Sequence, residues 1–133
     1  MQKRILLLPL FLLSASVLAA APVGQPIEVA LKIHSDIKPY TLSSENMPAP
    51  SWSKDGTLTV LYPASGDGSS HVVEAGARGR LVGNELYLCY SRAPTKYGPN
   101  AAIPAIAYLV AVEFRIRGLE HKNYKVQDVR ICE

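Results

Sequence analysis

Residues 77–91 read ARGRLVGNELYLCYS, and this stretch decides the fold. Two segments in which apolar and polar side chains alternate flank Gly83-Asn84, and a two-residue loop of this kind closes a tight β-hairpin. In that register Leu81 lies opposite Leu86, so the apolar side chains of both segments point to one face. Because the two strands agree on which face is buried, the sequence predicts an antiparallel hairpin here.

The same period of two residues recurs on both sides of the hairpin, and no helical period is found after residue 20. The predicted strands cover residues 27–34, 57–62, 71–75, 77–82, 85–91, 106–117 and 124–132. The apolar parity changes within the last strand, which predicts a bulge near Gln127 and Asp128. Pro63 ends the second strand, and prolines make residues 35–56 and 92–105 long connections.

Short strands separated by long connections are typical of all-β proteins. We therefore expect a small antiparallel β-sandwich of about seven strands, Ig-like in the loose sense, with a small β-barrel as the alternative. Trp52 falls in a connection, so we do not expect the tryptophan that packs on the core disulfide of antibody domains.

The N-terminal segment has the layout of a signal peptide. Lys3 and Arg4 form a basic head, residues 5–13 are apolar, and residues 14–21 are small or weakly polar. The apolar run is shorter than the ~20 residues that cross a bilayer as a helix, and no other stretch qualifies, so we expect no membrane span. Cleavage after residue 19 or 20 would leave a signal peptide, residues 1–20, and a single periplasmic or secreted domain, residues 21–133.

The charge balance argues against nucleic acid as a partner. The chain has 14 Lys and Arg against 11 Asp and Glu, and two of the basic residues, Lys3 and Arg4, leave with the signal peptide. Binding to nucleic acid requires clustered cations that contact many phosphates. The nearly neutral mature domain offers no such excess, so we expect no nucleic-acid partner.

Two cysteines, Cys89 and Cys132, remain in the mature chain. An even number in a small exported domain predicts a disulfide, since oxidising compartments preserve such bonds. Cys89 points away from the buried Leu88, and Cys132 points away from Ile131. The bond is therefore expected on the outer face, as a staple across neighbouring strands, and the chain-entropy model gives it ~4 kcal/mol of stabilisation.

No set of residues predicts catalysis or a cofactor. His34 and Asp36 form the one close pair of histidine and acid, but zinc sites need three or four ligands and nothing nearby completes the set. A nucleophile needs a base that is itself oriented, and no such motif is present. We therefore expect a protein that is not an enzyme and that holds no metal and no other cofactor.

Two features favour recognition. Residues 92–100 combine rigid prolines with Arg92, Lys96 and Tyr97 in a connection between strands, and such loops are common contact sites. The second is a basic face on the last predicted hairpin, where Arg115 and Arg117 would lie near two further cations, Lys125 and Arg130. Such a face would suit an anionic partner.

These observations predict an exported binding module, such as a periplasmic partner, an inhibitor or an immunity-type protein. We expect a monomer whose partner is a protein or another envelope component. The alternative is a pilin-like subunit of a surface fibre, because residues 27–34 form an alternating strand near the mature N-terminus that could complete a neighbour's sheet. The same strand could equally be the first strand of its own sheet.

Overall fold

The computed structural model describes residues 24–43 and 45–133, so the predicted signal peptide, residues 1–20, lies outside the described residues. The prediction of an all-β fold is confirmed. The strands are β1 (Gln25–His34), β2 (Ser51–Trp52), β3 (Leu58–Asp67), β4 (Ser70–Val82), β5 (Glu85–Pro94), β6 (Ala107–Arg117) and β7 (Lys125–Ile131). A single turn of 3₁₀ helix, η2 (Pro39–Thr41), follows β1. No helix in the described ranges is long and apolar enough to cross a membrane.

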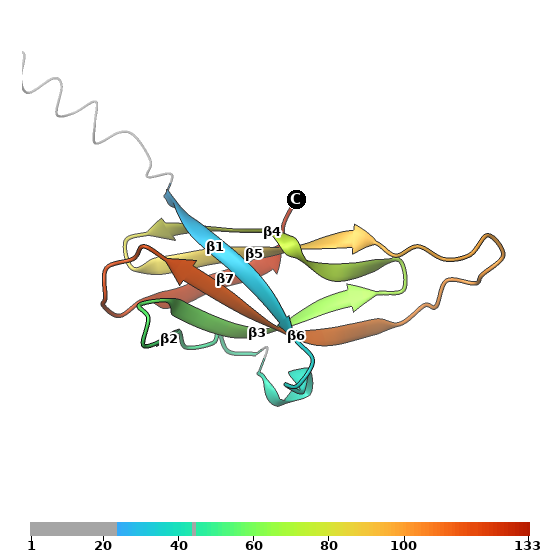
Figure 1. Cartoon of the computed structure of the whole chain (residues 1–133), viewed down its shortest axis with the longest axis horizontal. Helices are drawn as coiled ribbons and strands as arrows, with labels where there is room; N and C mark the ends of the chain where they lie inside the picture. The colour runs from blue at the N-terminus through green and yellow to red at the C-terminus, as the bar shows by residue number, and fades with distance from the viewer. Residues whose placement is uncertain (1–23, 44) are drawn as a thin grey trace, which may run out of the picture.

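The seven strands form one curled sheet in the order β2-β3-β6-β1-β4-β5-β7 (Figure 1). β1 joins the two halves of this sheet. Its first residues, 25–27, pair with β4, and residues 28–34 pair with β6, both antiparallel. The strand that could have been donated to a neighbour is therefore the central strand of its own sheet.

The sheet is mixed, so the prediction of a purely antiparallel arrangement was wrong. β5 and β7 run parallel because Lys125, at the start of β7, pairs with Glu85, at the start of β5. The predicted last hairpin was also wrong. β6 lies between β3 and β1, whereas β7 lies at the far edge beside β5, and residues 118–124 carry the chain from one half of the sheet to the other.

The hairpin around Gly83-Asn84 is confirmed, with Leu81 opposite Leu86. The predicted bulge in β7 is confirmed too, because Val126 pairs with Leu86 and Asp128 with Tyr87, which leaves one extra residue between them. The two strands predicted at 71–75 and 77–82 are a single strand, β4, with an irregularity between them.

β3 continues through Pro63 to Asp67, so the prediction that Pro63 ends the strand was wrong. Beyond β6, the other neighbour of β3 is β2, which pairs only with Leu58 and Thr59, so Pro63 lies on a free edge. A proline is tolerated there because no hydrogen bond of the ladder is lost. Similarly, β5 continues to Pro94, two residues beyond Arg92.

Both halves of the sheet contribute side chains to one core. The largest fully buried side chains are Leu58, Val60, Leu86, Leu88, Val112, Phe114, Ile116 and Val126. Each apolar side chain of this size contributes roughly 1.5–3 kcal/mol when it is fully buried. Since these residues alternate along β3, β5 and β6, the sequence pattern located the buried face of these strands correctly.

The predicted disulfide is confirmed. Cys89 and Cys132 are bonded, with a Cα–Cα distance of 5.0 Å. Cys89 pairs with Arg130 in the neighbouring strand β7, and the backbone N–H of Cys132, just beyond β7, donates to the carbonyl of Tyr90 at 2.7 Å. The bond is thus a staple between adjacent strands.

Trp52, in β2, contacts the turn that precedes β7. Its indole Nε1 donates to the carbonyl oxygen of Lys122 at 2.9 Å, and its ring stacks on His121 with centroids 4.5 Å apart. The ring of Tyr124 lies 6.2 Å away. Trp52 therefore ties β2, at one edge of the sheet, to the turn that leads into β7 at the other edge.

Candidate interaction sites

Residues 95–106 join β5 to β6 and form an arm at one end of the molecule (Figure 1). The chain carries no charged side chain from Tyr97 to Val112. Residues 98–107 are all exposed, and the exposed fractions reach 59% for Ile103 and 61% for Ile106. Beyond Lys96, the arm therefore presents a largely apolar surface without charged side chains to solvent.

The outgoing leg of the arm is fixed to the turn between β3 and β4. The backbone N–H of Thr95 donates to the carbonyl of Ser69 at 3.0 Å, and the Tyr97 hydroxyl donates to the carbonyl of Gly68 at 2.5 Å. His71 Nδ1 lies 3.0 Å from the Thr95 hydroxyl. These contacts hold the base of the arm at a defined place.

The return leg and the beginning of β6 pack directly on two glycines. A Cβ atom at Gly68 would lie 1.6 Å from the carbonyl oxygen of Pro104, and one at Gly66 would lie 2.4 Å from the ring of Tyr108. No larger residue fits at either position without moving the backbone or the ring. Both legs of the arm are thus seated on residues 66–69.

Asp67 organises this turn. Its Oδ1 accepts hydrogen bonds from the backbone N–H groups of Ser69 and Ser70, both at 2.8 Å, and from their hydroxyls at 2.9 and 3.1 Å. The hydrogen bonds from Ser69, followed by those from Ser70, lower the pKa of Asp67 to about 2. The turn under the arm is therefore built around a carboxylate that stays ionised.

Arg92 supports the arm from β5 and does not lie in it. Its Nε donates to the carbonyl of Ser65 at 2.7 Å and one terminal nitrogen donates to the Ser65 hydroxyl at 2.9 Å, while the other lies 3.4 Å from Asp67. The hydroxyl of Tyr90 accepts the Ser65 N–H at 3.1 Å. These bonds join the free edge of β3 to β5. Of the predicted loop residues, only Lys96 and Tyr97 belong to the arm, and Lys96 is exposed.

The predicted basic face is divided by the topology. Arg115 and Arg117 lie on β6, in one half of the sheet, whereas Lys125 and Arg130 lie on β7, at the edge of the other half. The proximity of the two pairs was predicted from a hairpin that does not form. Arg115 is also engaged by a carboxylate, since its Nε lies 3.3 Å from Glu113.

His34 contacts a second acid besides Asp36. Its Nε2 lies 2.6 Å from Glu113, and its Nδ1 lies 3.5 Å from Asp36. Burial raises the pKa of Glu113, but the hydrogen bonds from His34 and Arg115 outweigh burial and leave the pKa below its ordinary value. Across the described residues, no three His, Cys, Asp or Glu side chains are placed to hold a metal ion. In this cluster Glu113 therefore forms a hydrogen bond with His34 and an ion pair with Arg115.

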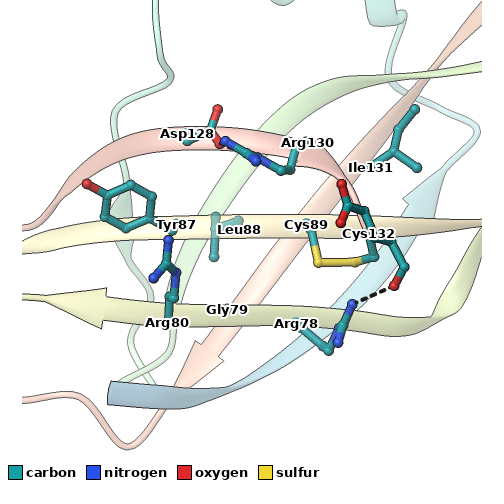
Figure 2. A pocket seen from close by; sticks show the side chains of 11 residues that line it. Arg78, Gly79, Arg80, Tyr87, Leu88, Cys89, Asp128, Arg130, Ile131 and Cys132 are labelled. Carbon is teal, nitrogen blue, oxygen red and sulfur yellow. Dashed lines mark hydrogen bonds and ion pairs between the residues drawn. A yellow bond between two sulfur atoms is a disulfide. The ribbon is translucent and has the colours of Figure 1, made fainter. Parts of the chain in front are cut away.

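A pocket of about 320 Å³ lies on the outer face of β4, β5 and β7, beside the disulfide (Figure 2). The residues that line it include three arginines, Arg78, Arg80 and Arg130. Arg78 and Arg130 both pair in register with Cys89, one on each side, so they flank the disulfide. Sequence reasoning missed this pocket because it depends on the parallel pairing of β5 with β7.

Each arginine of this pocket has a partner within the protein. Arg78 donates to the carbonyl oxygen of Glu133 at 3.1 Å, and Arg130 forms an ion pair with Asp128 at 2.5 Å (Figure 2). The guanidinium of Arg80 lies 4.8 Å from the ring centroid of Tyr87, a cation–π contact. The pocket is thus less available to an outside anion than its three cations suggest.

Comparisons with models of protein families, with curated proteins and with solved structures found no match to this chain.

Proposed function

We propose that this protein is an exported, non-enzymatic binding module that contacts a protein or another envelope component through the arm. The observation that carries the proposal is the combination of an uncharged, exposed apolar segment with a fixed base on residues 66–69. Exposed apolar patches of this kind mark interaction sites, and a loop that is already ordered loses little conformational entropy when it binds. The confirmed disulfide is compatible with a periplasmic or extracellular location.

The position of β1 favours this module over the fibre subunit. A donated strand must be free to enter a neighbour's sheet, whereas β1 pairs with both β4 and β6 and its Leu31 is 7% exposed. We accordingly propose a monomer that completes its own sheet. For the architecture we retain the loosely Ig-like sandwich as a proposal, since both halves of the curled sheet enclose a single core.

Site-specific photo-crosslinking tests the arm as the contact surface. A photoreactive amino acid at Ile103 should form adducts with an envelope component in the native envelope fraction. The matched control is the same amino acid at Leu61, which is 38% exposed on β3 and lies outside the arm. A second variant, Gly68→Ala, displaces Pro104 and should weaken crosslinking from position 103 although no other residue of the arm is substituted. Equal crosslinking from positions 103 and 61 would overturn the proposal.

A further inference from the structure

The apolar side chains of the arm are exposed all along its return leg. Residues 101–107 consist of alanine, isoleucine and proline, and every one of them is exposed. Binding energy at protein interfaces is concentrated in Trp, Tyr and Arg side chains that fill pockets. Here the one such residue in the arm, Tyr97, already donates its hydroxyl to Gly68. Small aliphatic groups without a specific shape suit an apolar medium better than a shaped pocket.

The charges around the arm suit a negatively charged surface. Lys96, at the base of the arm, is exposed and positive. The acidic residue of the supporting turn, Asp67, lies 3.4 Å from Arg92, whose positive charge partly offsets its repulsion of an anionic surface. Basic residues beside an apolar segment add electrostatic attraction to anionic lipids.

The backbone of the arm limits how deeply it can enter a bilayer. Irregular backbone is excluded from the hydrocarbon core because its polar groups would lose their hydrogen bonds. Pro99 and Pro104 have no N–H to satisfy, and the water and headgroups of the interface can serve the remaining groups. The arm is therefore suited to the headgroup region and the beginning of the acyl chains, a depth of roughly 5–10 Å.

We propose that the arm docks this protein on a lipid surface that contains anionic lipids, with Ile103 and Ile106 inserted at the interface and Lys96 among the headgroups. This inference rests on the proposed function, in which the arm is the contact surface, and it names a membrane surface as the partner. The protein lies on the surface and does not span it.

Flotation of the predicted mature domain, residues 21–133, with lipid vesicles tests this proposal. Vesicles of phosphatidylethanolamine and phosphatidylglycerol should bind the protein more tightly than vesicles of phosphatidylcholine alone. The double variant Ile103→Asp/Ile106→Asp should weaken binding by about tenfold or more, because it removes apolar burial and adds two carboxylates. The control Leu61→Asp makes the same type of change outside the arm and should bind within about twofold of the wild type. Lys96→Gln should weaken binding only to the anionic vesicles.

Insertion has a separate readout. Lipids brominated on the acyl chains should quench the tryptophan fluorescence of the variant Ile103→Trp but not that of Leu61→Trp. The wild type, in which Trp52 is the sole tryptophan, gives the background fluorescence. Failure of the wild type to bind either vesicle, or equal binding by the double variant, would overturn the lipid proposal. If crosslinks from Ile103 then fall on a protein, the binding module stands and its partner is that protein. If position 103 also crosslinks no better than position 61, the proposed function fails as well.

Discussion

The two parts of the molecule along its long axis are held together differently (Figure 1). In the larger part, β1 joins the two halves of the sheet and the disulfide fastens β7 to β5. Trp52 links β2, at one edge, to the turn that leads into β7, at the other edge. The arm part consists of residues 64–73 and 91–110. Neither β1 nor β7 pairs with these residues. Only the β3–β6 and β4–β5 ladders continue there, joined by the hydrogen bonds of Tyr90 and Arg92 to Ser65.

The two parts also place their apolar side chains differently. The largest fully buried residues, among them Phe114 and Leu86, lie in the larger part, whereas Ile103, Ile106 and Leu109 of the arm part are exposed. The turn at residues 118–124 shows the contrast most clearly, because its Tyr124 is buried beside Trp52. The largest buried side chains are therefore concentrated in one part, and the surface that we propose for contact lies in the other.

Removing the disulfide should have the largest effect and should act on the whole fold. We expect the double variant Cys89→Ala/Cys132→Ala to lose ~4 kcal/mol of unfolding free energy, since the bond closes a loop with a sequence separation of 43 residues. Urea denaturation followed by circular dichroism measures this loss. Reduced wild-type protein is the control and should show a similar loss. An unchanged midpoint would contradict the assignment of stability to this part.

Removing Arg92 should act mainly on the arm part. Arg92→Ala leaves the Ser65 carbonyl without its charged donor, and we expect a loss of about 1–2 kcal/mol. Hydrogen exchange should accelerate at residues 64–73 and remain slow in the core of β6. Arg117→Ala, an exposed cation on the same sheet, serves as the control and should change stability by less than about 0.5 kcal/mol. Faster exchange throughout the sheet would show that the two parts are one cooperative unit.

Acidification should have the smallest effect and should be confined to the seat of the arm. Because the folded pKa of Asp67 is lowered to about 2, its contribution is present above its unfolded pKa of about 3.9 and is lost as the pH falls through about 2. The NMR signals of the Ser69 and Ser70 amides should therefore be constant from pH 8 to about pH 4 and shift with a midpoint near 2. Asp67→Asn should reproduce the acid spectrum at neutral pH. A midpoint near 4 would show that the serines do not hold this carboxylate.

The alternation of residues along the chain was sufficient to predict most strands and their buried faces. In a half-buried strand, successive side chains point to opposite faces. Leu86 and Leu88 therefore identify the buried face of their strand without any knowledge of the neighbouring strand. The Gly83-Asn84 turn set a local register for the same reason, and the parity of the cysteines placed their bond on the outer face. Lys96 and Tyr97 were predicted as contact residues because loops between strands commonly carry contacts, and the structure places both of them, exposed, in the arm.

The sequence by itself determined the class of fold, the buried face of the β4–β5 hairpin and the disulfide, because each of these depends on local periodicity or on a count of cysteines. Only the tertiary structure decided that β7 pairs with β5 and not with β6, and hence that Arg115 and Arg130 lie in different halves. It also decided that Arg92 is a support and that the return leg of the arm is exposed. These outcomes depend on contacts between residues far apart in the chain, and the alternation of a strand is the same whichever neighbour it pairs with.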